Sequence, residues 1–189
     1  DSIDGAPSYD IDIEGVTAGI DYRFSDSFVG GVALGYTKQD TTLSSDQGSV
    51  DLRGLSLSLY STWYHESSWY VDSALSWANN DFEHRRRIEY TLPGQDVDQV
   101  ARADSDGNDT SATITFGRDF QHEEWTFGLY GRALYSHQTF DGFVEDLDSA
   151  LAGSGLALRV ESRSVDSLSS VLGGRASDEV EGASLRLTL

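Results

Sequence analysis

The residues best equipped for chemistry are four histidines: His65, His84, His122 and His137. A histidine beside a carboxylate can act as a general acid–base pair, and His137 could form such a pair with Asp141 or Glu83. No second catalytic motif accompanies this possible pair, and no Gly-x-Ser-x-Gly nucleophile motif is present. We therefore expect no enzyme.

Two charged runs offer ligand chemistry. Asp104 to Asp109 begins like a calcium-binding loop, but the twelfth position is Thr115, where such loops carry Glu. An Asp-Gly β-turn explains this run better, so we expect no metal and no cofactor. The three arginines Arg85 to Arg87 suit bidentate phosphate contacts, although a solvated loop top is the favoured interpretation.

Composition limits the partners. The formal net charge is −19 over 189 residues, which argues against nucleic acid because binding phosphates requires surface Lys and Arg. One domain is expected at this length. Cysteine is absent, so there is no disulfide framework and no thiolate metal site. No apolar run reaches the 18 residues of a membrane-spanning helix, yet strands that cross a membrane escape that test.

A hairpin from Gly54 to Trp77 is the clearest structural signal. Leu55, Leu57 and Leu59 alternate with serines, and after the turn at 65–68 the alternation resumes from Trp69. A period of two indicates strands with one apolar and one polar face. Each arm is about ten residues long, which suits a tilted transmembrane strand. Alternation alone leaves open a soluble hairpin whose apolar face packs on a core.

Connections alternate between short and long along the whole chain. Further strands are expected at 11–24, 28–38, 110–120, 125–137 and within 156–177, with a short one at 183–189. Short turns are expected at 25–27, 65–68 and 121–124, and long polar loops at 40–48, 79–109 and 140–155. Short turns on one rim and long loops on the other are typical of up-and-down membrane barrels. Glycines in the strand from Phe28 indicate close approach of another group on the inside.

Aromatic residues flank every short turn. Phe28, Trp63, Trp69 and Trp125 are the main members of this predicted girdle. Trp and Tyr favour the headgroup level of a bilayer. Tyr36, Trp77, Phe82 and Tyr135 are candidates for a second girdle nearer the long loops. Two belts favour the membrane barrel over the soluble one.

An ordered series of segments resembles autotransporter β-domains, the translocators of type V secretion. The series comprises Gly15–Asp26, Gly31–Tyr36, Leu57–Tyr60, Trp69–Asp72, Trp125–Tyr130 and Ser164–Leu168. The resemblance covers about Asp10 to Ser177. It implies an all-β, antiparallel, up-and-down transmembrane β-barrel, twelve-stranded in the family and represented here by about eight strands, in the bacterial outer membrane. It also implies export or display of an N-terminal passenger.

Against that template, the whole of 1–189 is one barrel domain. Passenger, pore helix and first strand are expected to be lacking, and 178–189 is a candidate non-contiguous final strand. The polar set expected to line the pore is Asp21, Arg23, Tyr60, Tyr70, Asp72, Tyr130 and Arg132; ordinary filling of the lumen explains it as well as contact with a pore helix does. Expected partners are the bilayer, lipopolysaccharide, the domain's own passenger and pore helix, and the barrel-assembly machinery. The alternative function is a standalone porin-like channel or adhesin.

Overall fold

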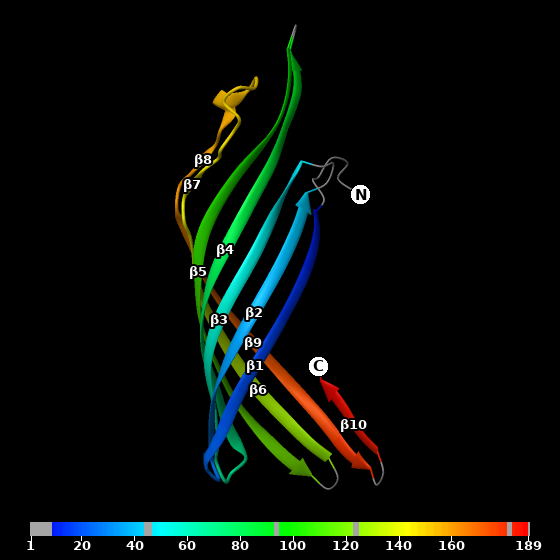
Figure 1. Ribbon diagram of the computed structural model, residues 1–189. Helices are drawn as coiled ribbons and strands as arrows, with labels where there is room; N and C mark the ends of the chain where they lie inside the picture. Colours follow the sequence, from blue (N-terminus) through cyan, green and yellow to red (C-terminus); the bar gives the residue numbers. More distant parts are fainter. Residues whose placement is uncertain (1–8, 44–46, 93–94, 123–124, 181–182, 189) are drawn as a thin grey trace.

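A single curved sheet dominates the molecule (Figure 1). The computed structural model describes residues 9–43, 47–92, 95–122, 125–180 and 183–188, without the side chains of 92, 95, 178–180 and 183–188. Its sheet strands are β1 (Tyr9–Ser25), β2 (Phe28–Leu43), β3 (Gly48–Tyr64), β4 (Trp69–Leu92), β5 (Gln95–His122), β6 (Trp125–Phe140), β9 (Arg163–Val180) and β10 (Ala183–Thr188). The connection from β6 to β9 holds β7 (Phe143–Val144), a 3₁₀ turn (Ser154–Leu156) and β8 (Arg159–Val160).

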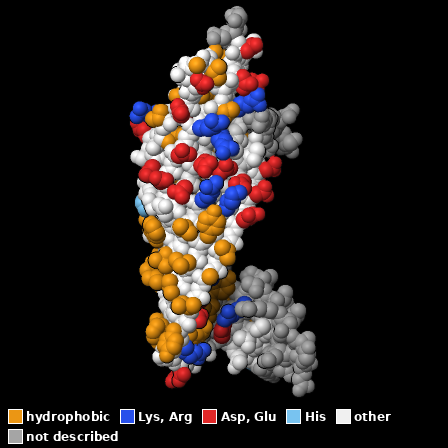
Figure 2. Space-filling view, viewed as in Figure 1, with side chains coloured by type: hydrophobic (Ala, Val, Ile, Leu, Met, Phe, Trp, Pro, Cys, Tyr) orange, Lys and Arg blue, Asp and Glu red, His pale blue; other side chains and the backbone are white. Residues whose placement is uncertain are grey.

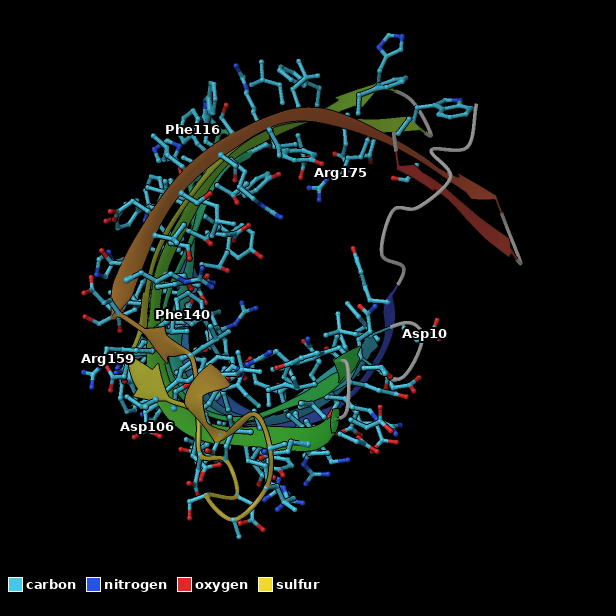
Figure 3. All side chains as sticks on the ribbon, turned by 90° about the horizontal axis from the view of Figure 1, so that it is seen from above. Asp10, Asp106, Phe116, Phe140, Arg159 and Arg175 are labelled. Atoms are coloured by element: carbon cyan, nitrogen blue, oxygen red, sulfur yellow. The ribbon has the colours of Figure 1, made fainter. Side chains whose placement is uncertain are left out.

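Each strand of the sheet pairs antiparallel with its neighbour in chain order. The order is β1-β2-β3-β4-β5-β6-β9-β10, an up-and-down meander. Seen from above, the strands form an open arc around a central space (Figure 3). The described sheet is therefore a partial barrel wall with β1 and β10 at its two edges. The all-β, up-and-down prediction is confirmed, as is the count of about eight strands.

The tight turns lie where the sequence predicts them. β1 ends at Ser25 and β2 begins at Phe28, and β3 and β4 are joined by 65–68. The second turn is closed by the Ser68 amide, which donates to the His65 carbonyl oxygen at 2.9 Å, and Ser68 has a positive φ of 65°. Both turns lie at the same end of the sheet (Figure 1).

The predicted long loop at 79–109 is wrong. β4 and β5 pair continuously from Asn79–Asn108 up to Leu92–Gln95, so this region is a tall hairpin. Its many charged residues are poor strand formers, which hid it from pattern analysis. Cross-strand pairs such as Arg87–Asp98, with Nη2 and Oδ2 3.3 Å apart, help hold it together.

Residues 141–162, which we call the hood, fold back onto the upper part of β4 and β5. The small apolar cluster of Ile88, Val97 and Ala101 packs there against Leu147 and Ala152 of the hood. In the described part of the chain, this is where buried apolar side chains gather, because only a few residues of the sheet are buried at all. Most large apolar side chains are exposed instead, which reverses the arrangement of a protein that folds around a core in water.

Candidate functional site

The concave face of the sheet carries a charged network. Arg175 of β9 points into the arc (Figure 3). Its Nη2 lies 2.6 and 2.7 Å from the two carboxylate oxygens of Asp119 on β5, and its guanidinium carbon lies 5.4 Å from the centre of the Tyr70 ring. Hydrogen bonds between ionised groups are stronger than neutral ones. The network links β4, β5 and β9 across the inside of the wall.

Tyrosine rings on this face cover glycines on the neighbouring strand. Tyr60 lies opposite Gly31, Tyr70 opposite Gly117 and Tyr130 opposite Gly173. A methyl group added at any of these three glycines would overlap the facing ring. The expectation that strand glycines mark a close approach on the inside is confirmed at Gly31. Glycine is required here for space rather than for its backbone freedom.

The seven predicted pore-lining residues share this concave face. Thr62 donates to Asp72 at 2.8 Å, and the Nε of Arg132 donates to the Thr115 hydroxyl at 2.9 Å. Tyr60 is two residues from Thr62, and Tyr130 is two residues from Arg132, so each pair shares a face. Asp21 lies opposite Gly31 and Arg23 lies two residues further on. That they line a transport pore stays a prediction.

The convex face is apolar over its lower half. Ile20 and Leu168 are both 76% exposed and Leu172 is 91% exposed. Leu168 and Leu172 share a face, as the sequence predicts. In Figure 2, apolar side chains gather in the lower half of the visible face and charged ones above them. Side chains of this kind are stable in contact with lipid, not with water.

Aromatic residues border this apolar zone. Phe28, Trp63 and Trp125 near the short turns are exposed, and Trp69 stacks on Phe116 with ring centres 4.8 Å apart. Their position at a membrane interface stays a prediction. Towards the upper border Tyr36, Trp77 and Tyr135 are also exposed. Phe82 does not belong to that second group, because its ring packs on Phe140, with ring centres 5.7 Å apart. The Phe82 ring also lies close to Gly107, where an added methyl group would come within 3.0 Å of it.

Above the apolar zone, charged residues meet in cross-strand rows. Lys38 lies directly opposite Arg53. One step higher, five carboxylates from β1 to β5 stand in register: Asp12, Asp40, Asp51, Glu83 and Asp104. Like charges in register repel, and Arg53 and Arg85 offset this partly, each with a nitrogen within 3.7 Å of Glu83.

An ion pair fixes the hood to the upper part of β4. Glu145, 7% exposed at its side chain, receives two hydrogen bonds from Arg86 and one from the Leu158 amide. The Arg86 hydrogen bonds hold the pKa of Glu145 below its usual value. Phe143 stacks on His84, with ring centres 4.5 Å apart, and burial lowers the pKa of that histidine.

Three sequence interpretations need correction. His137 pairs with Asp166, Nδ1 to Oδ1 at 2.9 Å, and not with Asp141 or Glu83. Its strand neighbour Tyr135 donates to the same oxygen, on the outer wall. The run from Asp104 to Asp109 is straight strand within β5 and forms neither a calcium loop nor a β-turn. Arg85 to Arg87 also lie in a strand, where Arg86 faces Glu145. The described residues contain no group of ligands suited to a metal ion.

Sequence analysis missed Arg175, Asp119 and the hood contacts. Arg175 and Asp119 are 56 residues apart, and their meeting depends on β6 lying between them in the sheet. One available signal was period-two alternation, which places Asp119 on the same face as Thr115 and Gly117.

A sheet with a convex face that is apolar over its lower half, a polar concave face, tight turns at one end and a tall hairpin at the other defines the wall of an up-and-down outer-membrane β-barrel. No helix in the described ranges has the length and apolarity needed to cross a bilayer. The autotransporter β-domain model matches residues 1–189, and the chain belongs to that family. It is an outer-membrane translocator domain of a Gram-negative bacterium.

Similar proteins agree with this placement. The chain is 30% identical over 154 residues to the adhesin BmaC autotransporter of Brucella suis, which covers 77% of this chain and 4% of BmaC. It is 25% identical over 155 residues to the esterase EstA of Pseudomonas aeruginosa, covering 80% of this chain and 23% of EstA. The chain thus spans under a quarter of either relative.

Solved structures share the fold. The translocator domain of autotransporter NalP from Neisseria meningitidis superposes with a TM-score of 0.72 at 15% identity, covering 89% of this chain and 55% of that one. The β domain of the Bordetella autotransporter BrkA gives a TM-score of 0.58 at 20% identity, covering 92% and 64%.

Proposed function

We propose that this domain anchors a passenger in the outer membrane and gives it a polar path to the surface. The observation that carries the proposal is the polar concave face, with the Arg175–Asp119–Tyr70 network, behind an apolar convex face. A passing chain or pore helix needs hydrogen-bonding groups on one side of the wall and lipid needs none on the other. The passenger and pore helix would precede residue 1, and further strands would complete the barrel.

Neighbouring residues on β4 allow a direct test. The chain has no cysteine, so a single cysteine can carry a photocrosslinker. Ala74 shares the concave face with Tyr70 and Asp72, whereas Leu75 is 60% exposed on the outer wall. In full-length protein stalled during export, we expect adducts with the passenger from Ala74→Cys and none from Leu75→Cys. Equal yields at the two positions would refute a path along this face and favour a standalone barrel.

We propose that lipopolysaccharide is the outer-leaflet partner. Lys38 and Arg53 form the first charged pair above the apolar zone, next to Tyr36 and Leu55 in register. Phosphates of lipid A lie at this height in an outer leaflet, and Arg suits them. Arg53→Gln should weaken lipopolysaccharide retention in detergent severalfold, with exposed Arg159→Gln on the hood as the control. Loss of equal size in both variants would indicate unspecific charge attraction.

We infer that the domain itself catalyses no reaction and that the barrel-assembly machinery inserts it. The His137–Asp166 pair supports the first point, because it lies with Tyr135 on the outer wall, with no nucleophile joined to it among the contacts described. Both the wild-type domain and His137→Ala should hydrolyse lipid and peptide substrates no faster than the buffer background. Hydrolysis above background in the wild type that His137→Ala abolishes would make the pair catalytic.

A further inference from the structure

Arg118 is a charged side chain in an apolar part of the outer wall. It lies on β5 two residues after Phe116, which points away from the arc in Figure 3. Side chains two apart on a strand share a face, so Arg118 faces outward as well. Its cross-strand partners are Trp69 on β4 and Leu129 on β6, and Leu129 is 64% exposed.

Aromatic rings hold the Arg118 guanidinium in place. Its central carbon lies 4.9 Å from the centre of the Trp69 ring and 4.8 Å from that of Phe120. Trp69 is itself stacked on Phe116. Such cation–π contacts fix the orientation of a guanidinium but leave its charge uncompensated.

No anion in the described part of the chain pairs with this guanidinium. None of the ion pairs found there includes Arg118, and its Nε is buried without a hydrogen-bond partner. A charge on a lipid-facing wall is costly at the bilayer centre and tolerated near the headgroups. Arg118 lies near the end with short turns, which in outer-membrane barrels is the periplasmic end.

We propose that Arg118 is a binding site for the phosphate of a glycerophospholipid in the periplasmic leaflet. The rings of Trp69 and Phe120 present the guanidinium, whose planar fork can bind two phosphate oxygens at once. The outward apolar side chains beside it, Leu129 among them, contact the acyl chains. The site therefore selects a phosphodiester attached to a lipid rather than phosphate alone.

The test measures lipid retention by native mass spectrometry of the full-length protein in a neutral detergent. The probes are dioleoylphosphatidylglycerol, dioleoylglycerol with the same chains but no phosphate, and inorganic phosphate. We expect the wild-type protein to retain the phospholipid at least tenfold better than either other probe. Arg118→Gln should lower phospholipid affinity about tenfold, because charge-assisted hydrogen bonds are lost. Arg118→Lys, which keeps charge without the fork, should lie between.

The matched control is Arg102→Gln, an exposed outward arginine higher on the same strand. It should retain the phospholipid as the wild type does. Equal retention of dioleoylglycerol by the wild-type protein would overturn the proposal without any variant having to fold. Equal losses in Arg118→Gln and Arg102→Gln would also overturn it, since charge alone would then explain binding.

Discussion

Single side chains on the concave face replace the packed core that this wall lacks. Tyr60, Tyr70 and Tyr130 each fill the space left by a glycine on the next strand. Arg175 adds a charged link over one of these rings. Strand-to-strand fit is therefore local, and a change of one methyl group can disturb it.

Gly117→Ala should destabilise the domain by about 1–3 kcal/mol, because the new methyl group overlaps the Tyr70 ring and forces it out of place. The measurement is the free energy of unfolding in denaturant after insertion into vesicles. Gly131→Ala is the control, since its methyl would meet Leu172 at an ordinary 3.4 Å. Equal losses in both variants would contradict a role for the ring.

The sequence predicted which face most of these residues occupy, because alternation is a local property. It did not predict which tyrosine meets which glycine. Tyr70 and Gly117 are joined through the register of β4 with β5, and that register is fixed by a hairpin whose upper half looked like a loop. The pairing of Arg175 with Asp119 was also out of reach, because it depends on the registers of β5 with β6 and of β6 with β9.

Among the elements, the tall hairpin and its hood depend on each other. Without the hood, the even-numbered side chains of upper β4, including Arg86 and Ile88, would be exposed to solvent. Period-two alternation does continue through this stretch, with charged residues at odd positions. The apolar residues of this stretch are too few to stand out among the charged ones, so the sequence pattern did not indicate a strand. The hood residues that cover it come more than 50 residues later in the chain.

Acidification should release the hood in two steps. The His84 pKa is lowered by burial, so the stability from its neutral form is complete above the ordinary value of 6.5 and is lost as pH falls below it. The Glu145 pKa is lowered by Arg86, so its contribution is present above 4.5 and is lost as pH falls further. Protection of the amides at 143–160 against hydrogen exchange, after correction for the intrinsic pH dependence of exchange, should therefore fall in both windows.

His84→Phe separates the two steps. The ring still stacks on Phe143 but no longer titrates, so the step below pH 6.5 should vanish and the lower one remain. Protection factors in the hood that stay constant from pH 7.5 to 4 in the unmodified protein would contradict the assignment of these groups.

At the scale of the whole molecule, the two faces of the wall suit different environments, lipid on the convex side and water on the concave side. Composition alone, at −19 net charge and 38% apolar residues, describes an acidic soluble protein. The distinction lies in where those residues go: carboxylates above the zone of exposed leucines, and apolar side chains outward. Alternation and the girdles predicted this much, whereas the height of each strand had to come from the structure.

Leu168→Arg should cost about 2–4 kcal/mol of unfolding free energy in vesicles, because the charge enters the middle of the lipid-facing zone. Ser169→Arg, one residue on and on the opposite face, should cost far less since it remains in the polar lumen. Equal costs would mean that the convex face does not contact lipid.

The uneven lengths of the strands also decide which part of the domain a molecule approaching the cell surface contacts first. β4 and β5 have 24 and 28 residues, against roughly ten needed to cross the bilayer. At about 3.3 Å per residue, their tip stands tens of ångströms above the lipid. An antibody, phage or protease therefore contacts this acidic hairpin, with the hood packed against it, before any other described part of the wall. Selection by phage and by the immune system would act on this hairpin first and would leave the membrane-embedded part of the strands unchanged.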